Sequence, residues 1–587
     1  MSDGLAGFAF PMIAPFAHKA RQLLTDPVLR RWLVRRATGV VDAPAPFTPH
    51  RPPYVSEPAT DAGAPTPPRP LPEMSAPAPI APIVLPLPGV DLTLAPGDER
   101  DVFSRSFADV ETLLALHRFA WLPMVADGEA KSSWAQALWT EWRHRFATDG
   151  DDDRSGWAWH PYTAAERACN LLDLATAGGL PAPANETVRV LDRHLAAIFD
   201  RLEYLGEHDT SNHLSNNGRG IFRLGLALGR RGWADLGAKI LVEESSRIVL
   251  PSGVLREGSS HYHLLIARNY ADAWLAARAY GHAAEPALQA ITARMLAAAK
   301  RLMLPGGLPL IGDVSPDCPP KYLVALAGGD AGEGWLAGRT VDERSVLNGL
   351  MIGTADPAGL LADGWLAVVT GHWSGLWHAS PQGWPPMPGH AHQDLGSFEL
   401  HLEDLPVIVD PGRGAYGETG EAARYPSGRV HNTLLVDDRD PYPANKPYYD
   451  DNFRKRIIGV PPVLAANGRT VTLTHHGFTR LRGVGALARR WTFGDCGVTV
   501  DDQLHGRGRN RLVRRFVTPL EVEALPMGAL LKGGGRTLWV SAGPGASMTV
   551  RPITVWRAYG CGRPGTLIEF TERATLPWSG RATIEVS

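Results

Sequence analysis

The spacing of apolar residues changes near residue 350, and this change constrains the fold more than any other feature of the chain. From about residue 104 to 349, apolar positions recur at helical spacing, as in Val110, Leu114 and Trp121. After about residue 353, short β-branched and aromatic runs are separated by turn dipeptides such as Asn467-Gly468. The sequence therefore predicts an all-α part followed by an all-β part, that is, two domains with a ligand cleft between them.

Two segments with other compositions precede the helical part. Residues 43–88 are roughly one-third Pro, so we expect residues 43–100 to form an extended linker or an arm that wraps the surface. Residues 1–42 contain the basic run Arg30–Arg36. We expect a helix there on the domain surface, with a helix at a membrane surface as the alternative. The expected domains are therefore 1–42, 43–100, 101–352 and 353–587.

Composition excludes several classes of protein. The net charge is −2, which argues against a globally basic nucleic-acid binder. The four cysteines show no CxxC pairing, so a disulfide framework and a cysteine zinc site are not expected. We expect no integral membrane segment, because no apolar run is long enough. No export signal is recognisable, so a cytoplasmic protein is expected, while a periplasmic or membrane-peripheral location and a homodimer stay open.

The densest polar cluster lies in the β part. His390 and His392 flank Ala391, so both imidazoles lie on one side of an extended segment. Asp410 ends an apolar strand at a Pro-Gly turn, and His431 opens the next strand. Two His and one Asp from neighbouring strand ends can bind Zn²⁺ and leave a fourth position for water. The alternative is a set of ordinary hydrogen-bonded residues at strand ends.

Further candidates interrupt the apolar helices. One group holds Asn212, His213 and Asn216, another holds Glu257, Tyr262 and His263, and a weaker one includes Trp159 and Arg167. Amides can hold a carboxylate, Tyr can act as an acid or base, and Trp can stack on sugar faces. Each group also has a structural interpretation, because Ser and Asn are favoured helix caps and aromatic residues are common in helical cores.

These groups, in this order, resemble the heparinase II/III family of polysaccharide lyases. The similarity covers roughly residues 105–587, and its motifs are Trp159-His-Pro, Asn212-His213, Glu257-Gly-Ser, Tyr262-His263, Gly389-His-Ala-His392, Val409-Asp-Pro-Gly412, His431-Asn-Thr433 and Tyr559-Gly560. The resemblance implies an α+β multidomain fold, with an incomplete (α/α) toroid followed by an antiparallel β-sandwich. It implies that the chain is an enzyme acting on an acidic polysaccharide.

The resemblance also assigns roles to residues. It implies that Asn212 and His213 neutralise the substrate carboxylate, that Tyr262 is the catalytic base or acid, and that His390 is its partner. It implies a structural Zn²⁺ bound by His392, Asp410 and His431. The other residues expected at the substrate are Trp159, Arg167, Asn216, Glu257, His263, Arg424 and Tyr425, the last because alginate-acting relatives place a second active-site Tyr there.

The expected reaction is β-elimination at a 4-linked uronic acid, which leaves a 4,5-unsaturated uronate end. Whether Tyr262 or His390 is the base stays open. A glycoside hydrolase is one alternative, with Asp209, Glu257 and Asp394 as candidate carboxylates. A non-catalytic protein that binds an acidic exopolysaccharide is another. The polysaccharide, its linkage and the choice between endo and exo action are not predicted.

Overall fold

The structure is a computed structural model that describes residues 24, 27–39, 50–59, 63–126, 128–148, 156–207, 210–329, 332–386, 389–417, 419–443 and 451–587. Asp209 lies outside these ranges, as do most of residues 1–42. The α-helices are α2 Pro27–Ala37, α3 Val110–Arg118, α4 Glu129–Phe146, α5 Pro161–Gly178, α6 Ala184–Phe199, α7 Asn212–Leu228, α8 Arg231–Ile248, α9 Ser260–Tyr280, α10 Glu285–Leu302, α11 Gly334–Ala337, α12 Val341–Met351, α13 Pro357–Ala362 and α14 Asp451–Ile458.

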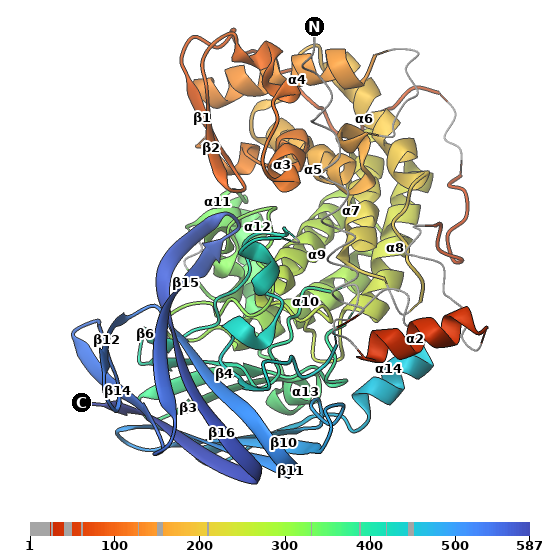
Figure 1. The fold of residues 1–587 in the computed structure, drawn as a ribbon. Coiled ribbons are helices and arrows are strands. Elements are labelled where there is room, and N and C mark those ends of the chain that lie inside the picture. Colours follow the sequence, from red (N-terminus) through yellow and green to blue (C-terminus); the bar gives the residue numbers. More distant parts are fainter. Residues whose placement is uncertain are drawn as a thin grey trace, which may run out of the picture.

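The strands are β1 Ile83–Leu87, β2 Val90–Leu94, β3 Trp365–Thr370, β4 Trp373–His378, β5 Phe398–Leu402, β6 Leu405–Ile408, β7 Leu434–Val436, β8 Val463–Asn467, β9 Thr470–His475, β10 Val484–Phe493, β11 Gly497–Thr518, β12 Glu521–Leu525, β13 Gly528–Gly533, β14 Arg536–Ala542, β15 Ser547–Ala558 and β16 Cys561–Val586. The predicted order of a helical part followed by an antiparallel β part is confirmed, and Figure 1 shows the two parts as separate bodies in contact.

Capping side chains fix where the two helices that carry the candidate site begin. Ser211 caps α7 by accepting the His213 N–H, and Ser259 caps α9 by accepting the Tyr262 N–H. A capping hydroxyl satisfies one of the backbone donors that the first helical turn leaves unpaired. As a result, Asn212 and Tyr262 lie in the first turns of their helices.

The proline-rich segment, expected as an extended linker or a surface-wrapping arm, contains a short β-hairpin. Strands β1 and β2 form a hairpin whose Leu85 and Leu94 are buried in the core of the helical part. The reason is the alternation of apolar residues from Ile83 to Leu94, which a proline count does not register. Before the hairpin, the chain runs as an arm along the helices and forms backbone hydrogen bonds through His50 and Met74.

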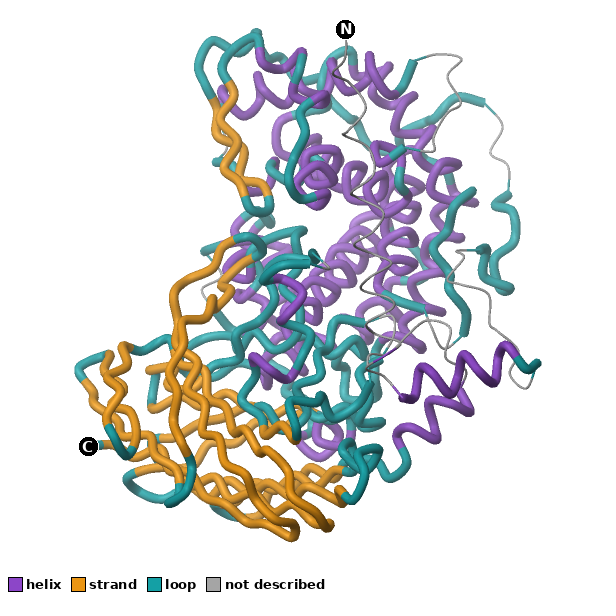
Figure 2. The backbone as a smooth tube through the Cα atoms, in the orientation of Figure 1, coloured by secondary structure: helices purple, strands orange, loops and turns teal. Residues whose placement is uncertain are grey.

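The β part contains a four-stranded sheet, β3–β6, and a ten-stranded sheet built around the long strands β11 and β16. One hydrophobic core unites them, because Trp377 and Phe398 of the smaller sheet are buried in the same cluster as Trp491 and Phe516 of the larger one. Figure 2 shows the strands gathered at one end of the molecule and the helices at the other. The two sheets therefore form one folded unit.

The hairpin β15–β16 joins the β part to the helical part, and in Figure 1 it rises toward β1 and β2. Gly560 at its tip has φ +69°, and a Cβ there would lie 2.1 Å from the Cα of Gly89, in the turn between β1 and β2. Only glycine permits this conformation and this approach of two backbones.

The basic run Arg30–Arg36 falls within helix α2, which Figure 1 shows beside α14. No described helix combines the length and the hydrophobicity that crossing a bilayer requires.

Candidate active site

Three rings from both parts of the molecule meet at the N-terminus of α9. The Tyr262 ring stacks on the His390 ring with centroids 3.4 Å apart and planes 11° apart. The Tyr262 hydroxyl is hydrogen-bonded to the Tyr416 hydroxyl. Tyr262 belongs to the helical part, whereas His390 and Tyr416 belong to loops of the β part. The cluster therefore exists only when the two parts are together.

The carboxylate of Asp313 orients both histidines of the His-x-His segment. One oxygen lies 3.0 Å from His390 Nδ1 and the other lies 2.9 Å from His392 Nε2. Although burial opposes ionisation, these hydrogen bonds hold the pKa of Asp313 below its ordinary value. An ionised carboxylate can only accept hydrogen bonds, so His390 Nδ1 and His392 Nε2 are assigned as the N–H donors. In these tautomers His390 Nε2 and His392 Nδ1 carry the lone pairs.

Asn212 occupies the space beside His390 Nε2. Its Nδ2 lies 3.4 Å from that nitrogen and donates to Glu257 Oε2 at 2.8 Å, while its backbone N–H donates to Glu257 Oε1 at 2.6 Å. Both Asn212 and Glu257 are buried. Glu257 thus acts as a holder of the Asn212 amide, because its two oxygens are already engaged.

His213 is a solvent-accessible member of the site, with 45% of its side chain exposed. Its Nδ1 lies 2.7 Å from Glu203 Oε1. Burial works against the charged ring, but the Glu203 carboxylate outweighs burial and raises the pKa of His213. The same pair lowers the pKa of Glu203 against the opposing effect of burial. Glu203 thereby favours the cationic form of the His213 ring beside Asn212.

Tyr416 is held by the hairpin tip. The Tyr559 hydroxyl accepts the Tyr416 backbone N–H at 3.1 Å and donates to Asp109 Oδ2 at 2.7 Å. Asp109 is also the side-chain cap of α3. One hydroxyl thus connects the start of a helix to the loop that carries Tyr416.

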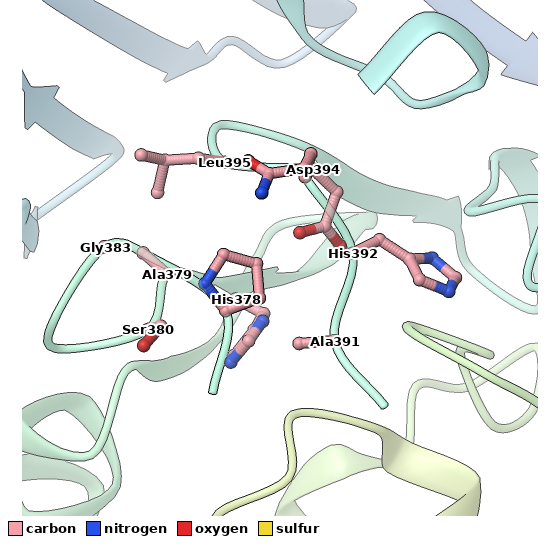
Figure 3. A pocket seen from close by; sticks show the side chains of 10 residues that line it. His378, Ala379, Ser380, Gly383, Ala391, His392, Asp394 and Leu395 are labelled. Carbon is pink, nitrogen blue, oxygen red and sulfur yellow. The ribbon is translucent and has the colours of Figure 1, made fainter. Parts of the chain in front are cut away.

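A second cluster, formed by His392, Asp394 and His431, could hold a metal ion. These buried side chains each offer one ligand atom, and the three atoms lie within 4.8 Å of one another. His392 Nδ1 is buried and has no hydrogen-bond partner. A cavity of about 10 Å³ lined by His378, His392 and Asp394 lies alongside, as Figure 3 shows. Histidine and carboxylate side chains are usual zinc ligands, and the unpartnered His392 Nδ1 fits a zinc site here.

Asp410, expected as the third ligand, lies next to this cluster. Its Oδ2 is 2.9 Å from His431 Nδ1, and its Oδ1 accepts the Gly412 N–H at 2.9 Å. Burial raises the pKa of Asp394 to about 6, whereas the pKa of Asp410 is lowered because His431 outweighs burial. The structure thus brings His392 and His431 together with two carboxylates. Asp394 offers a ligand atom near both histidines, whereas Asp410 is bonded to His431.

Several residues expected at the substrate have other positions. Trp159 and Arg167 are buried in the helical core, where Arg167 donates to the carbonyls of His117 and Ala158. His263 is buried and bonded to the backbone of Leu255 and Met295. The polar groups of Arg167 and His263 are thus engaged by backbone partners within the helical part. The sequence could not separate these core residues from site residues, because both classes are polar or aromatic and have helical spacing.

Asn216, Tyr425 and Arg424 also lie outside the ring cluster. Asn216 is buried and its Nδ2 lies 3.5 Å from the Tyr162 carbonyl. The Tyr425 hydroxyl donates to the Thr554 carbonyl at 2.8 Å. Arg424 is exposed and lines a different cavity. Tyr416, nine residues before Tyr425, is the tyrosine that joins Tyr262.

Sequence reasoning missed Asp313, Glu203 and Tyr416. Asp313 follows the apolar run Leu308–Ile311 and a glycine, much as Asp410 follows Val407–Val409. An Asp at the end of an apolar run was the available signal for Asp313. Tyr416 and Glu203 have no comparable local signal.

Residues 353–575 match the family model described as Heparinase II/III-like, C-terminal. The chain is therefore heparinase II/III-like in this part, as the resemblance in the sequence predicts. A search among curated protein sequences gives no match.

Two solved structures share the fold. A heparinase III has a TM-score of 0.60 and 16% identity, with 82% of this chain and 78% of that chain covered. The heparan sulfate lyase HepC from Pedobacter heparinus has a TM-score of 0.51 and 16% identity, with 82% of this chain and 77% of that chain covered.

Proposed function

We propose that this heparinase II/III-like chain is a polysaccharide lyase that cleaves a uronate-containing acidic polysaccharide by β-elimination. The observation that carries the proposal is the stack of Tyr262 on His390, with the Asn212 amide 3.4 Å from the same imidazole. An acid–base pair and a neutral amide donor next to a cationic His213 are the groups that this reaction needs. The family match and the two lyases of the same fold support the prediction of an enzyme of this class.

The first requirement is neutralisation of the uronate carboxylate, because its charge opposes removal of the C5 proton. The His213 imidazolium, whose pKa Glu203 raises, supplies positive charge on the exposed side of the site. The Asn212 amide, fixed by Glu257, supplies a preorganised hydrogen-bond donor. Groups that are oriented before reaction stabilise the developing negative charge at C5 and its carboxylate without reorganising.

The second requirement is proton transfer. Burial raises the pKa of Tyr262 well above its ordinary value, so the free enzyme holds the phenol. A phenol can protonate the leaving O4 oxygen, while His390 Nε2, left as the lone-pair nitrogen by Asp313, can accept the C5 proton. Because the two rings stack, the proposal has both groups act from one side of the substrate. Within the proposal, His390 is the base and Tyr262 is the acid.

The metal cluster supports the position of His390. A Zn²⁺ bound by His392 and His431 with Asp394 or Asp410 would fix the loop geometry. His390 lies two residues from His392, and both share the Asp313 carboxylate. The role of the metal in this proposal is structural.

The finer description of the fold belongs to the same proposal. We infer that helices α3–α10 form an incomplete (α/α) toroid and that the two sheets form a β-sandwich. The core shared by Trp377 and Trp491 supports the sandwich, and the heparinase III of similar fold supports both parts.

The test is ultraviolet absorbance during incubation with heparan sulfate, hyaluronan, alginate and glucuronan. We expect a rising signal from a conjugated unsaturated uronate on one of them. Tyr262→Phe should lower kcat by about 10²–10⁴-fold because the proton donor is lost. The matched control is Tyr425→Phe, which removes a tyrosine hydroxyl bound to Thr554 outside the ring cluster, and it should stay within about threefold of the original turnover.

The outcomes separate the alternatives. New reducing ends without the absorbance would identify a hydrolase. No product on any polymer, from a folded and metal-loaded protein, would contradict the lyase and favour a binding protein. The structure offers a hydrolase little support, because Glu257 is buried with both oxygens bonded to Asn212.

A further inference from the structure

An arginine-lined cavity of about 540 Å³ lies in the β part, and none of its lining residues belongs to the ring cluster or the metal cluster. Its charged lining comes from five arginines and two carboxylates: Arg424, Arg429, Arg511, Arg515, Arg551, Asp438 and Glu569. Positive charge is therefore in excess on its walls. A volume of this size holds a small ligand such as one or two sugar units.

The arginines converge from segments that are distant in sequence. Arg511 and Arg515 lie on β11, Arg551 lies on β15, and Glu569 lies on β16. Arg424 and Arg429 lie on two short 3-10 turns between Ala422 and Val430. The strand positions are fixed by the pairing of β16 with both β11 and β15, so the walls are rigid. A site built on rigid strands needs little ordering when a ligand binds.

The two carboxylates satisfy only part of this charge. Glu569 pairs with Arg515 Nε at 2.8 Å and with Arg551 Nε at 3.1 Å, and Asp438 pairs with Arg511 and, at 3.6 Å, with Arg515 Nη2. Arg515 is 4% exposed, yet its Nη1 is buried without a hydrogen-bond partner. Among the described residues, no hydrogen bond or ion pair engages the guanidinium of Arg424. These two arginines, which both line the cavity, thus keep donors that no described residue engages.

An unsatisfied buried donor and a surplus of like charges both cost stability in the free protein. An oxyanion offsets both, because guanidinium groups bind carboxylate, sulfate and phosphate through paired hydrogen bonds. All five cations are arginine rather than lysine, and a planar fork of donors suits this ligand chemistry.

We propose that this cavity is a second, non-catalytic binding site for an oxyanion-bearing ligand, such as the carboxylate or sulfate group of an acidic saccharide. The site does not depend on the proposed lyase chemistry. Two sources share the ligand chemistry, namely a free inorganic anion and an acidic group carried on a sugar chain.

The experiment uses calorimetric titration of the full chain in the Tyr262→Phe background, where turnover is blocked. The probes are inorganic sulfate and a heparan sulfate hexasaccharide. Arg551 and Arg424 are exposed, so Arg551→Gln and Arg424→Gln should fold normally, as circular dichroism will verify. The matched control is Arg509→Gln. Arg509 is exposed and lies on β11, the strand that also carries Arg511 and Arg515, but it does not line the cavity.

We expect each cavity variant to weaken binding of at least one probe by about tenfold, with Arg509→Gln unchanged. Tighter binding of the hexasaccharide would identify a sugar-chain ligand, and equal or tighter binding of sulfate would identify a free anion. The proposal is overturned if neither probe binds at millimolar concentration, or if the cavity variants bind like the Arg509 control. The failure of lyase activity would leave this result intact, because the titration measures no turnover.

Discussion

At the residue scale, buried carboxylates organise the candidate site. Asp313 orients two histidines, Glu257 holds the Asn212 amide, and Glu203 raises the pKa of His213. None of the three needs to touch the substrate. Each contacts the side chain of another residue of the candidate site, so we expect a conservative change at any of them to act through that partner.

Asp313→Asn should reduce both metal content and turnover. An amide cannot accept from both rings through two equivalent oxygens, so the tautomers of His390 and His392 are no longer fixed together. We expect a loss of about 10–100-fold in metal affinity, measured by elemental analysis after dialysis against a chelator. The comparison variant is His392→Asn, which removes a metal ligand and leaves the Asp313–His390 bond. Turnover that falls equally in both would contradict a direct role of Asp313 at His390.

We expect the His213–Glu203 pair to make activity depend on pH. The pKa of His213 is raised in the folded protein, so the pair stabilises the fold below the unfolded pKa and this contribution is lost as pH rises through the raised value. The cationic form is needed to neutralise the uronate, so kcat/KM should fall on that same alkaline limb. Glu203→Gln removes the group that raises this pKa and should shift the limb to lower pH. A limb that stays in place in this variant would show that another group controls it.

At the element scale, the proline-rich arm is held against the ends of helices by glycines. Gly229 ends α7 with φ +72°, and a Cβ there would lie 2.2 Å from the Thr66 carbonyl oxygen of the arm. The Thr66 carbonyl of the arm thus occupies the space that a side chain at position 229 would need. The same residues that end the helix make room for the segment that covers it.

Gly229→Ala should lower the free energy of unfolding by about 2–4 kcal/mol, as backbone strain and displacement of the arm add. Gly281→Ala is the matched control: Gly281 ends α9 with φ +63°, but a Cβ there meets no atom within 4 Å. It should lose only about 1 kcal/mol from backbone strain. Urea unfolding measures both, and equal losses would mean that the arm contributes nothing at this contact.

At the scale of the whole molecule, the site depends on contact between the helical and β parts. Tyr262 and Asn212 come from helices, whereas His390 and Tyr416 come from β-part loops. The hairpin β15–β16 crosses between the two parts and ends in Tyr559, which bonds to both Asp109 and Tyr416. The relative position of the two parts is thereby coupled to the position of a tyrosine in the ring cluster.

Tyr559→Phe should lower kcat about tenfold. The change removes the hydrogen bond from the Tyr416 N–H and the hydrogen bond to Asp109, each worth about 1 kcal/mol. The unfolding transition should change little, since the ring remains packed. Steady-state kinetics and thermal unfolding measure the two effects. Turnover equal to that of the original protein would show that the hairpin tip does not position Tyr416.

The sequence by itself determined the order of a helical and a β part, since apolar periodicity reports which face of each element is buried. It also singled out Asn212, His213, Tyr262, His390, His392 and His431 as candidates, because these residues stand in dense polar motifs. Trp159, Arg167 and His263 have the same composition and spacing, and only the packing shows that they lie outside the ring cluster. The tertiary structure alone decided that Asp313 joins two histidines, that Tyr416 meets Tyr262, and that five arginines form one cavity. These contacts join residues far apart in the chain, and such distances are set by how the helices and sheets pack, which no local pattern encodes.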